Sequence, residues 1–175
     1  MIVPIDDLMA MPEFVGKSET VMQMKLNALE QLIRSYTNNN FQNRNVRFKG
    51  NTLGNRIFGG SPYLSVNDTV QITQSGVNDG LYTITEIASN FIRVDRSLFM
   101  VDNNLVTKVE YPVDIYVGVI NLLTWEVSNR QKVGIKAETL SRHSVTYFDQ
   151  DASNSIMGYP VSLLGFLQPY MKARF

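Results

Sequence analysis

The sequence contains no cysteine and a single histidine among its 175 residues. The lack of cysteine excludes disulfides, thiol nucleophiles and cysteine-ligated zinc sites. The single histidine, His143, follows Arg142, and a neighbouring guanidinium disfavours the protonated imidazole that a general base must pass through. We therefore interpret His143 as a surface or interface residue, and this interpretation removes the residue type most often used in acid–base catalysis.

An excess of positive charge is also lacking. Lysine plus arginine and aspartate plus glutamate number 16 each, so the formal net charge is zero. Tight phosphate binding needs a cationic face, so this balance argues against a dedicated nucleic-acid binder. It also weakens the long-range repulsion between copies of the chain.

Long apolar runs are absent too. No stretch approaches the roughly 20 apolar residues that span a bilayer, and the Met-Ile-Val-Pro start lacks the basic region of a signal peptide. We expect no membrane contact and a protein that acts inside a cell or in a particle assembled there.

The remaining polar clusters do not match known chemical motifs. Asp149 and Asp151 lie near Asn154, but the mid-loop glycine and the bidentate glutamate of a calcium loop are missing. The glycine-containing loops 50–56 and 59–61 are not followed by the Gly-Lys-Ser/Thr of a phosphate-binding loop. We predict no enzyme, no catalytic residues, no metal site and no cofactor.

The N-terminal region is predicted to be helical. Ser18 is a favourable N-cap, and Asn38 begins a run of asparagines that ends the helix. Between them, apolar residues recur every three or four positions and form one stripe of an amphipathic helix: Met22, Leu26, Leu29, Ile33 and Tyr36.

The middle region, residues 44–110, has short alternating strands in place of helical periodicity. Turn signals separate these strands at Asn51, Gly59-Gly60, Asn78-Asp79-Gly80, Asn90 and Asn103-Asn104. This pattern predicts a small antiparallel barrel or meander. Barrels of this size also bind carbohydrate or single-stranded nucleic acid, and the region offers aromatic and basic residues for it: Phe48, Tyr63, Tyr82, Phe91, Phe99, Arg47, Arg56, Arg93 and Arg96.

The C-terminal region is predicted to return to helix. A helix begins at Pro112 and carries the apolar stripe Tyr116, Ile120, Leu123 and Val127. Residues 144–148 resemble a strand, and a short apolar helix is expected from Pro160 to Pro169. The predicted fold class is α+β: a small helical core, residues 1–43 and 111–175, with an antiparallel β-subdomain, residues 44–110, inserted between its helices.

The order of these C-terminal features resembles that of head–tail connector or adaptor proteins, also called head-completion proteins, of long-tailed bacteriophages. The residues that carry the resemblance are an apolar helix ending in Thr124-Trp125-Glu126-Val127, then Gly134-Ile135-Lys136-Ala137-Glu138-Thr139-Leu140, Ser144-Val145-Thr146-Tyr147 and the closing Leu167-Gln168-Pro169-Tyr170. The N-terminal helix also fits the family's plan. The β-region departs from it, because simpler members have only a short connection there.

The resemblance implies a structural virion protein of the neck. Such proteins form a homo-oligomeric, usually dodecameric, ring beneath the portal protein, extend the DNA channel and present a face to a tail-completion or neck protein. Genomic DNA passes through the lumen without specific binding. The alternatives are another virion ring, such as a tail-completion or baseplate protein, or the carbohydrate- or nucleic-acid-binding barrel.

Three sets of residues are candidates for these contacts. An amphipathic C-terminal tail, a candidate hook for the portal, comprises Tyr170, Met171, Lys172, Arg174 and Phe175. A second set lies on a predicted strand: Ile135, Glu138, Leu140, Val145 and Tyr147. This strand either presents an exposed edge to a neighbouring subunit or, equally, forms an ordinary hairpin within the chain. Possible channel-lining residues are Lys132, Lys136 and Arg142.

Overall fold

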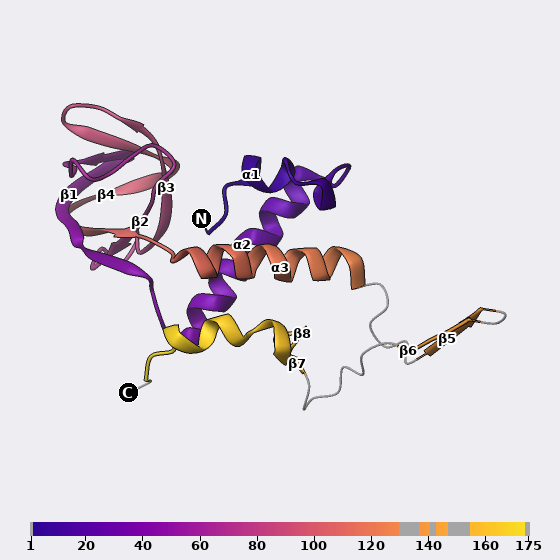
Figure 1. The fold of residues 1–175 in the computed structure, drawn as a ribbon. Helices are drawn as coiled ribbons and strands as arrows, with labels where there is room; N and C mark the ends of the chain where they lie inside the picture. Colours follow the sequence, from indigo (N-terminus) through magenta and orange to yellow (C-terminus); the bar gives the residue numbers. More distant parts are fainter. Residues whose placement is uncertain (1, 130–136, 141–142, 147–154, 174–175) are drawn as a thin grey trace. The chain divides into compact units, whose positions relative to one another are not determined.

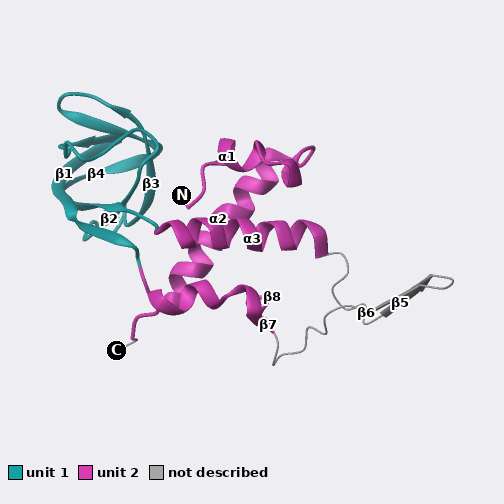
Figure 2. Ribbon diagram, in the orientation of Figure 1, with its two compact units in different colours: residues 1, 40–111 teal, residues 2–39, 112–175 magenta. Residues whose placement is uncertain are grey.

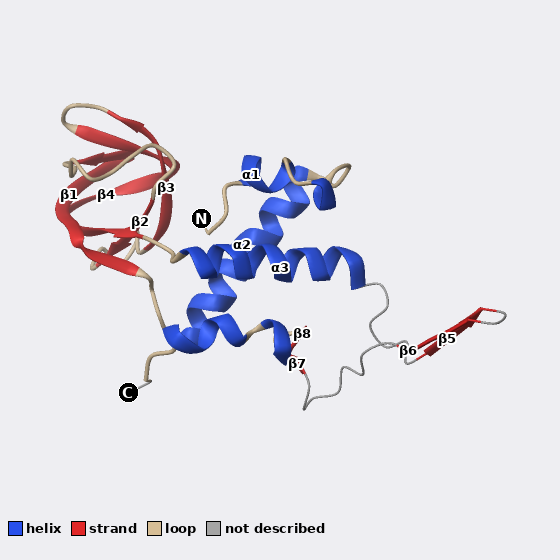
Figure 3. Ribbon diagram, in the orientation of Figure 1, coloured by secondary structure: helices blue, strands red, loops and turns tan. Residues whose placement is uncertain are grey.

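The computed structural model describes residues 2–129, 137–140, 143–146 and 155–173. The chain divides into two compact units (Figure 2), a β-unit of residues 40–111 and a helical unit of residues 2–39 and 112–175. Helices and antiparallel strands are both present (Figure 3), which confirms the predicted α+β class.

The helical unit is built on two α-helices, α2 (Glu19–Thr37) and α3 (Val113–Asn129), shown in Figure 1. Shorter elements complete it: α1 (Ile5–Met9), the 3-10 helices η1 (Pro12–Phe14), η3 (Val161–Leu163) and η4 (Gly165–Tyr170), and the strand pairs β5 (Ala137–Leu140) with β6 (His143–Thr146) and β7 (Ser155–Ile156) with β8 (Tyr159–Pro160).

Helix α2 follows its predicted pattern closely. Four members of the predicted stripe are buried: Met22, Leu26, Leu29 and Ile33. Tyr36 is only half-buried, and Thr37 is buried in its place, with its hydroxyl donating to the Ile33 carbonyl at 2.7 Å. Ser18 is the N-cap but its side chain makes no capping hydrogen bond, and Asn38 ends the helix in the left-handed conformation at φ 49°.

Helix α3 buries a different line from the predicted one. The buried residues are Ile115, Gly118, Val119, Leu122, Leu123 and Glu126, whereas Tyr116, Ile120 and Val127 are half-buried. Leu123 is therefore the one fully buried member of the predicted stripe. The helix is apolar around most of its circumference, so several three- and four-residue spacings fit equally well.

The predicted short C-terminal helix takes the form of two 3-10 helices. Pro160 ends strand β8, and residues 161–170 form the two 3-10 helices η3 and η4, with Pro169 inside the second. Proline supplies no N–H for an α-helical hydrogen bond, which favours short 3-10 pieces here. Phe166 packs onto Gly118 of α3 so closely that a Cβ at Gly118 would lie 2.4 Å from its ring.

The β-unit has four antiparallel strands, β1 (Gln42–Phe58), β2 (Thr69–Thr73), β3 (Gly80–Ile87) and β4 (Phe91–Val109). Their order is β1-β4-β2-β3, and β4 also pairs with β3, so β4 contacts every other strand of the unit. The turns predicted at Asn51 and Asn103-Asn104 are wrong, because β1 and β4 run straight through them. The extra residues are taken up by register shifts, with Asn103 in the left-handed region at φ 58°.

The β-unit has an apolar core of its own. Its buried members come from all four strands and the β1–β2 loop: Val46, Ile57, Leu64, Val70, Ile72, Ile84, Ile92, Val94, Leu98 and Val106. Phe48 and Tyr82 pack against this cluster.

We predict that the helical unit folds without the β-unit. The ends of the insertion lie side by side, because Gln42 pairs with Val109 and the Glu110 N–H donates to the Phe41 carbonyl at 2.9 Å. Paired Cα atoms in antiparallel strands are about 5 Å apart, so a short Gly/Ser linker replacing residues 43–108 spans the gap at little entropic cost. Circular dichroism should show the helical signal retained with a cooperative melt. Loss of that signal would mean that the two units fold as one.

Candidate functional site

The C-terminal segment lies along the C-terminal end of α2. The Lys172 N–H donates to the Thr37 carbonyl at 2.8 Å. Two asparagines that follow the helix also reach the segment: Asn38 Nδ2 donates to the Ala173 carbonyl at 2.8 Å and Asn39 Nδ2 to the Tyr170 carbonyl at 3.2 Å. Helix ends leave carbonyls without intrahelical partners, so the segment supplies one of the missing donors.

Tyr170 fixes the start of this segment. Its hydroxyl donates to the Asp114 carboxylate in the first turn of α3 at 2.7 Å. This hydrogen bond is the main reason that the pKa of Tyr170 is raised. The segment therefore contacts both long helices through polar groups, while the side chains of Met171 and Lys172 stay exposed. Arg174 and Phe175, also predicted for the hook, lie outside the described residues.

The predicted strand edge forms a hairpin within the chain. Strands β5 and β6 pair antiparallel, from Ala137 with Thr146 to Leu140 with His143. Among the described residues this sheet has two strands, so each strand keeps one outer edge. Glu138, Leu140 and Val145 lie on the hairpin. Ile135 and Tyr147, and the channel candidates Lys132, Lys136 and Arg142, lie outside the described residues.

Two apolar stripes on the helices remain uncovered. On α2, Val21 and Met24 are 48% and 66% exposed, three residues apart on one face. On α3, Val113 and Val117 are 78% and 48% exposed, four residues apart. We call these the α2 stripe and the α3 stripe. Sequence reasoning missed them because it assigned the helices' apolar residues to one core.

A partly buried ion pair, also missed from the sequence, joins the helices. Glu126 on α3 is 7% exposed, and its carboxylate contacts Lys25 Nζ of α2 and accepts a 2.6 Å hydrogen bond from the Tyr159 hydroxyl of β8. The Trp125 and Tyr159 rings lie 5.7 Å apart beside it. The only sequence signal was a lone glutamate within an apolar helix. The Glu126 carboxylate contacts both the Lys25 ammonium and the Tyr159 hydroxyl, so the arrangement holds α2, α3 and β8 together.

The aromatic residues of the β-unit are largely engaged within the unit. Tyr82 is half-buried with Arg96 over its ring at 4.8 Å, and Arg56 lies 4.9 Å from the Phe91 ring centroid. These arginines therefore cover the rings that a stacking surface would need. Tyr63 and Phe99 are the exposed exceptions, at 70% and 69%.

Within the described ranges no three His, Asp or Glu side chains are grouped to hold a metal ion. Among the same residues no helix is both long and apolar enough to cross a membrane.

Comparison with known proteins finds a likeness among solved structures but none among family models or curated proteins. No family model and no curated protein matches the chain. A solved structure that is similar is a chain from the neck of an empty GTA particle, computed with C6 symmetry. The two chains are 12% identical with a TM-score of 0.34, over 99% of this chain and 91% of that one. A likeness at this TM-score establishes neither a shared fold nor a shared function, so function is argued from the chain's own residues.

Proposed function

We propose that this chain is a non-enzymatic structural protein of a tailed phage-like particle, a head–tail adaptor that assembles into a ring in the neck. The observation that carries the proposal is the pair of uncovered stripes on α2 and α3. They lie on two different helices of one unit, and a contact between unlike surfaces generates a ring when its rotation closes. Burying each of these side chains stabilises association by about 1.5 to 3 kcal/mol at most.

The sequence resemblance supplies the location. The motif around residues 134–147 and the closing residues 167–170 are similar to those of adaptor proteins, which dock beneath a portal. The ring would extend the DNA channel and present its far face to a tail-completion or neck protein. Lys132, Lys136 and Arg142 stay candidates for the channel lining, and the hairpin residues Glu138, Leu140 and Val145 for subunit contacts.

The C-terminal segment is the proposed contact with the portal. Its backbone is held by α2 and its first side chain by Asp114, so it is pre-organised. Such a segment contacts a partner through Met171 and the residues beyond it. The segment differs from an unattached tail, because its hydrogen bonds to α2 and α3 also stabilise the folded helical unit.

Deleting residues 171–175 tests the portal contact. We expect at least tenfold weaker co-sedimentation with the portal, because losing one buried apolar anchor costs about 1.4 kcal/mol or more. Removing the Lys172 donor should also lower stability by about 0.5 to 1.5 kcal/mol. The matched control is Met171→Ala in the full-length chain, which keeps the backbone bonds and should weaken only portal binding. Unchanged portal affinity in both variants would refute the hook.

Ring assembly is tested on the helix stripes. Met24→Asp and Val117→Asp each place a charge on one stripe, and both should shift the sedimenting species from ring to monomer at equal concentration. Gln31→Asp, at an exposed polar position of α2, is the control and should assemble normally. Assembly that is indifferent to both stripe variants would place the subunit contact elsewhere.

DNA binding should be weak. A channel lining must let DNA pass, and the equal numbers of acidic and basic residues give no strong cationic surplus. We expect duplex binding that falls steeply with salt and shows no sequence preference. Nanomolar affinity at physiological salt in a filter-binding assay would overturn this part of the proposal.

A further inference from the structure

The β1–β4 ladder contains two successive bulges. Between the pairs Gly50↔Asn104 and Gly54↔Leu98, the register shifts twice, and each time β4 carries one residue more than β1. In the second bulge, Leu53 alone faces Phe99 and Met100. These three side chains, which we call the bulge patch, are 54%, 69% and 77% exposed. A bulge re-aims side chains, and here it directs two adjacent large apolar residues of one strand to solvent.

Buried polar groups hold the bulge patch in place. Asn78, 1% exposed, accepts from the Phe99 N–H at 2.8 Å and donates to the Phe99 carbonyl at 2.9 Å. The hydroxyl of Thr52, also 1% exposed, donates to the same carbonyl at 2.7 Å and accepts from Asn78 Nδ2 at 3.0 Å. Both backbone groups of Phe99 are therefore fixed from the interior.

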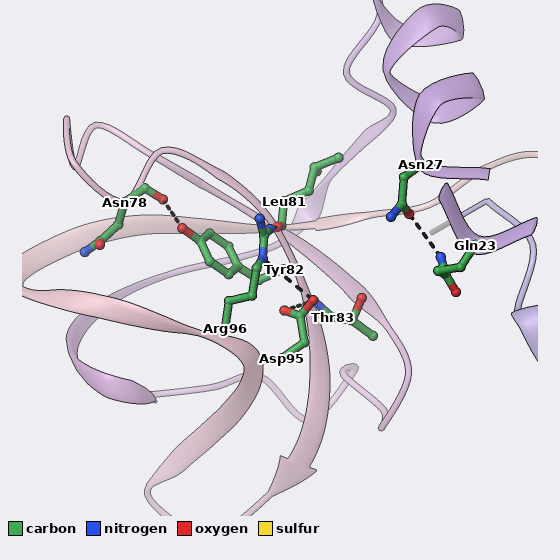
Figure 4. A network of polar contacts seen from close by, with 8 residues as sticks. All are labelled: Gln23, Asn27, Asn78, Leu81, Tyr82, Thr83, Asp95 and Arg96. Carbon is green, nitrogen blue, oxygen red and sulfur yellow. Dashed lines mark hydrogen bonds and ion pairs between the residues drawn. The ribbon is translucent and has the colours of Figure 1, made fainter. Parts of the chain in front are cut away.

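A second layer supports this arrangement. The Tyr82 hydroxyl donates to the Asn78 carbonyl at 2.9 Å, and Arg96 lies over the Tyr82 ring (Figure 4). On the other side Asn104, 0% exposed, donates to the carbonyls of Gly50 at 3.1 Å and Val101 at 2.7 Å. Buried hydrogen-bond networks rigidify the groups that they join, and among the described residues Asn104 Oδ1 is the one buried side-chain acceptor left without a partner. A rigid apolar projection loses little entropy when it binds, which is the property of interface anchors.

The charges around the bulge patch indicate the kind of partner. Asn78 brings residues 75–80 against Phe99, and among residues 50–55, 75–80 and 97–104 the charged residues are Asp79 and Asp102, with no lysine or arginine. Phosphate binding requires cations, so nucleic acid does not fit this surface. An apolar surface without basic neighbours matches an apolar pocket on a protein.

The size of the bulge patch argues against a dimer of this chain. Three such side chains expose on the order of 350 Å², in the range of the largest apolar patch on a typical monomer. A stable pairwise interface buries about 800 Å² per partner. The bulge patch is therefore too small for a free dimer, but repetition around a ring would multiply its strength.

We infer that the bulge patch docks into an apolar pocket on a different protein of the particle. The inference rests on the proposed ring, which supplies the repeated copies. Phe99 and Met100 would enter the pocket, Leu53 would close one side, and Asn78 is a positioning residue that acts through the Phe99 backbone.

The test uses assembled particles carrying a photoreactive benzoylphenylalanine at position 99. Position 63 is the matched control, because Tyr63 is 70% exposed on the same unit and lies outside the bulge patch. After irradiation, the crosslinked product is identified by mass spectrometry. We expect a crosslink from position 99 to one other particle protein, and none from position 63. The variant Phe99→Ser/Met100→Ser should reduce incorporation of that protein roughly tenfold or more. The apolar variant Phe99→Leu/Met100→Leu should restore the incorporation. Both variants should have the same melting temperature as Tyr63→Ser, which controls for folding.

Each other outcome is decisive. A crosslink only to another copy of this chain, to nucleic acid or to carbohydrate would overturn the inference, as would no crosslink in particles that contain the chain. If the chain is absent from the particles, the ring proposal fails, and the docking inference fails with it.

Discussion

Leu123→Ala is expected to lower the free energy of unfolding by about 2 to 5 kcal/mol. Leu123 is fully buried in α3, next to the equally buried Leu122. Truncation of this side chain removes apolar contacts and leaves a cavity between α3 and the residues packed against it. Urea denaturation followed by circular dichroism measures the change, provided that both proteins are compared at the same concentration and oligomeric state.

The matched control for this variant is Asn121→Ala on the same helix. Asn121 is exposed and lies outside the α3 stripe, and alanine is the better helix former, so the change should be smaller than about 0.7 kcal/mol. Equal costs at the two positions would contradict the observed orientation of α3.

Lys25→Met is expected to cost about 2 to 3 kcal/mol. The change removes the positive charge of Lys25 from beside the buried Glu126 carboxylate, which still accepts from the Tyr159 hydroxyl. Breaking a buried pair from one side typically costs about 3 to 5 kcal/mol. The Lys25 side chain is 35% exposed, so water reaches part of the pair and reduces the cost.

The double variant Lys25→Met/Glu126→Gln separates charge from packing. Glutamine keeps an oxygen that accepts from Tyr159 but carries no charge, so it should recover most of the loss. A double-mutant cycle on thermal unfolding gives the coupling energy. Additive losses would show that Lys25 and Glu126 act independently.

The helices illustrate how far the sequence determines the fold. Helix α2 is polar on one side, so the spacing of its apolar residues predicted which of them are buried. The turn preference of asparagine predicted that the helix ends at Asn38. Helix α3 is apolar almost throughout, so its buried face depends on what packs against it, above all Phe166 at Gly118. The apolar spacing of residues 161–170 suits several helical types, so the sequence did not predict that they form 3-10 helices.

The β-unit shows a second limit. Asparagine tolerates the left-handed conformation in turns and bulges alike, so Asn51 and Asn103 were read as turns. In the structure Asn103 adopts that conformation inside β4, where its N–H donates to Asn51 Oδ1 at 2.9 Å. The bulge patch lies in the next bulge of the same ladder, and the pattern of the separate strands did not predict it.

The candidate site was predicted only in part. Tyr170 to Lys172 were singled out as an amphipathic tail, but their contacts with Asp114, Thr37 and Asn39 join residues far apart in the chain. Such contacts leave no local pattern. The portal contact, the hairpin contact and the channel lining stay predictions.

Electron microscopy of the purified portal protein, imaged alone and after addition of this chain, tests the central claim most directly. The proposed adaptor predicts an added ring on one face of the portal, concentric with its channel and with the portal's rotational symmetry. Portal particles that look the same with and without the chain, together with a chain that sediments as a monomer at every concentration, would contradict it.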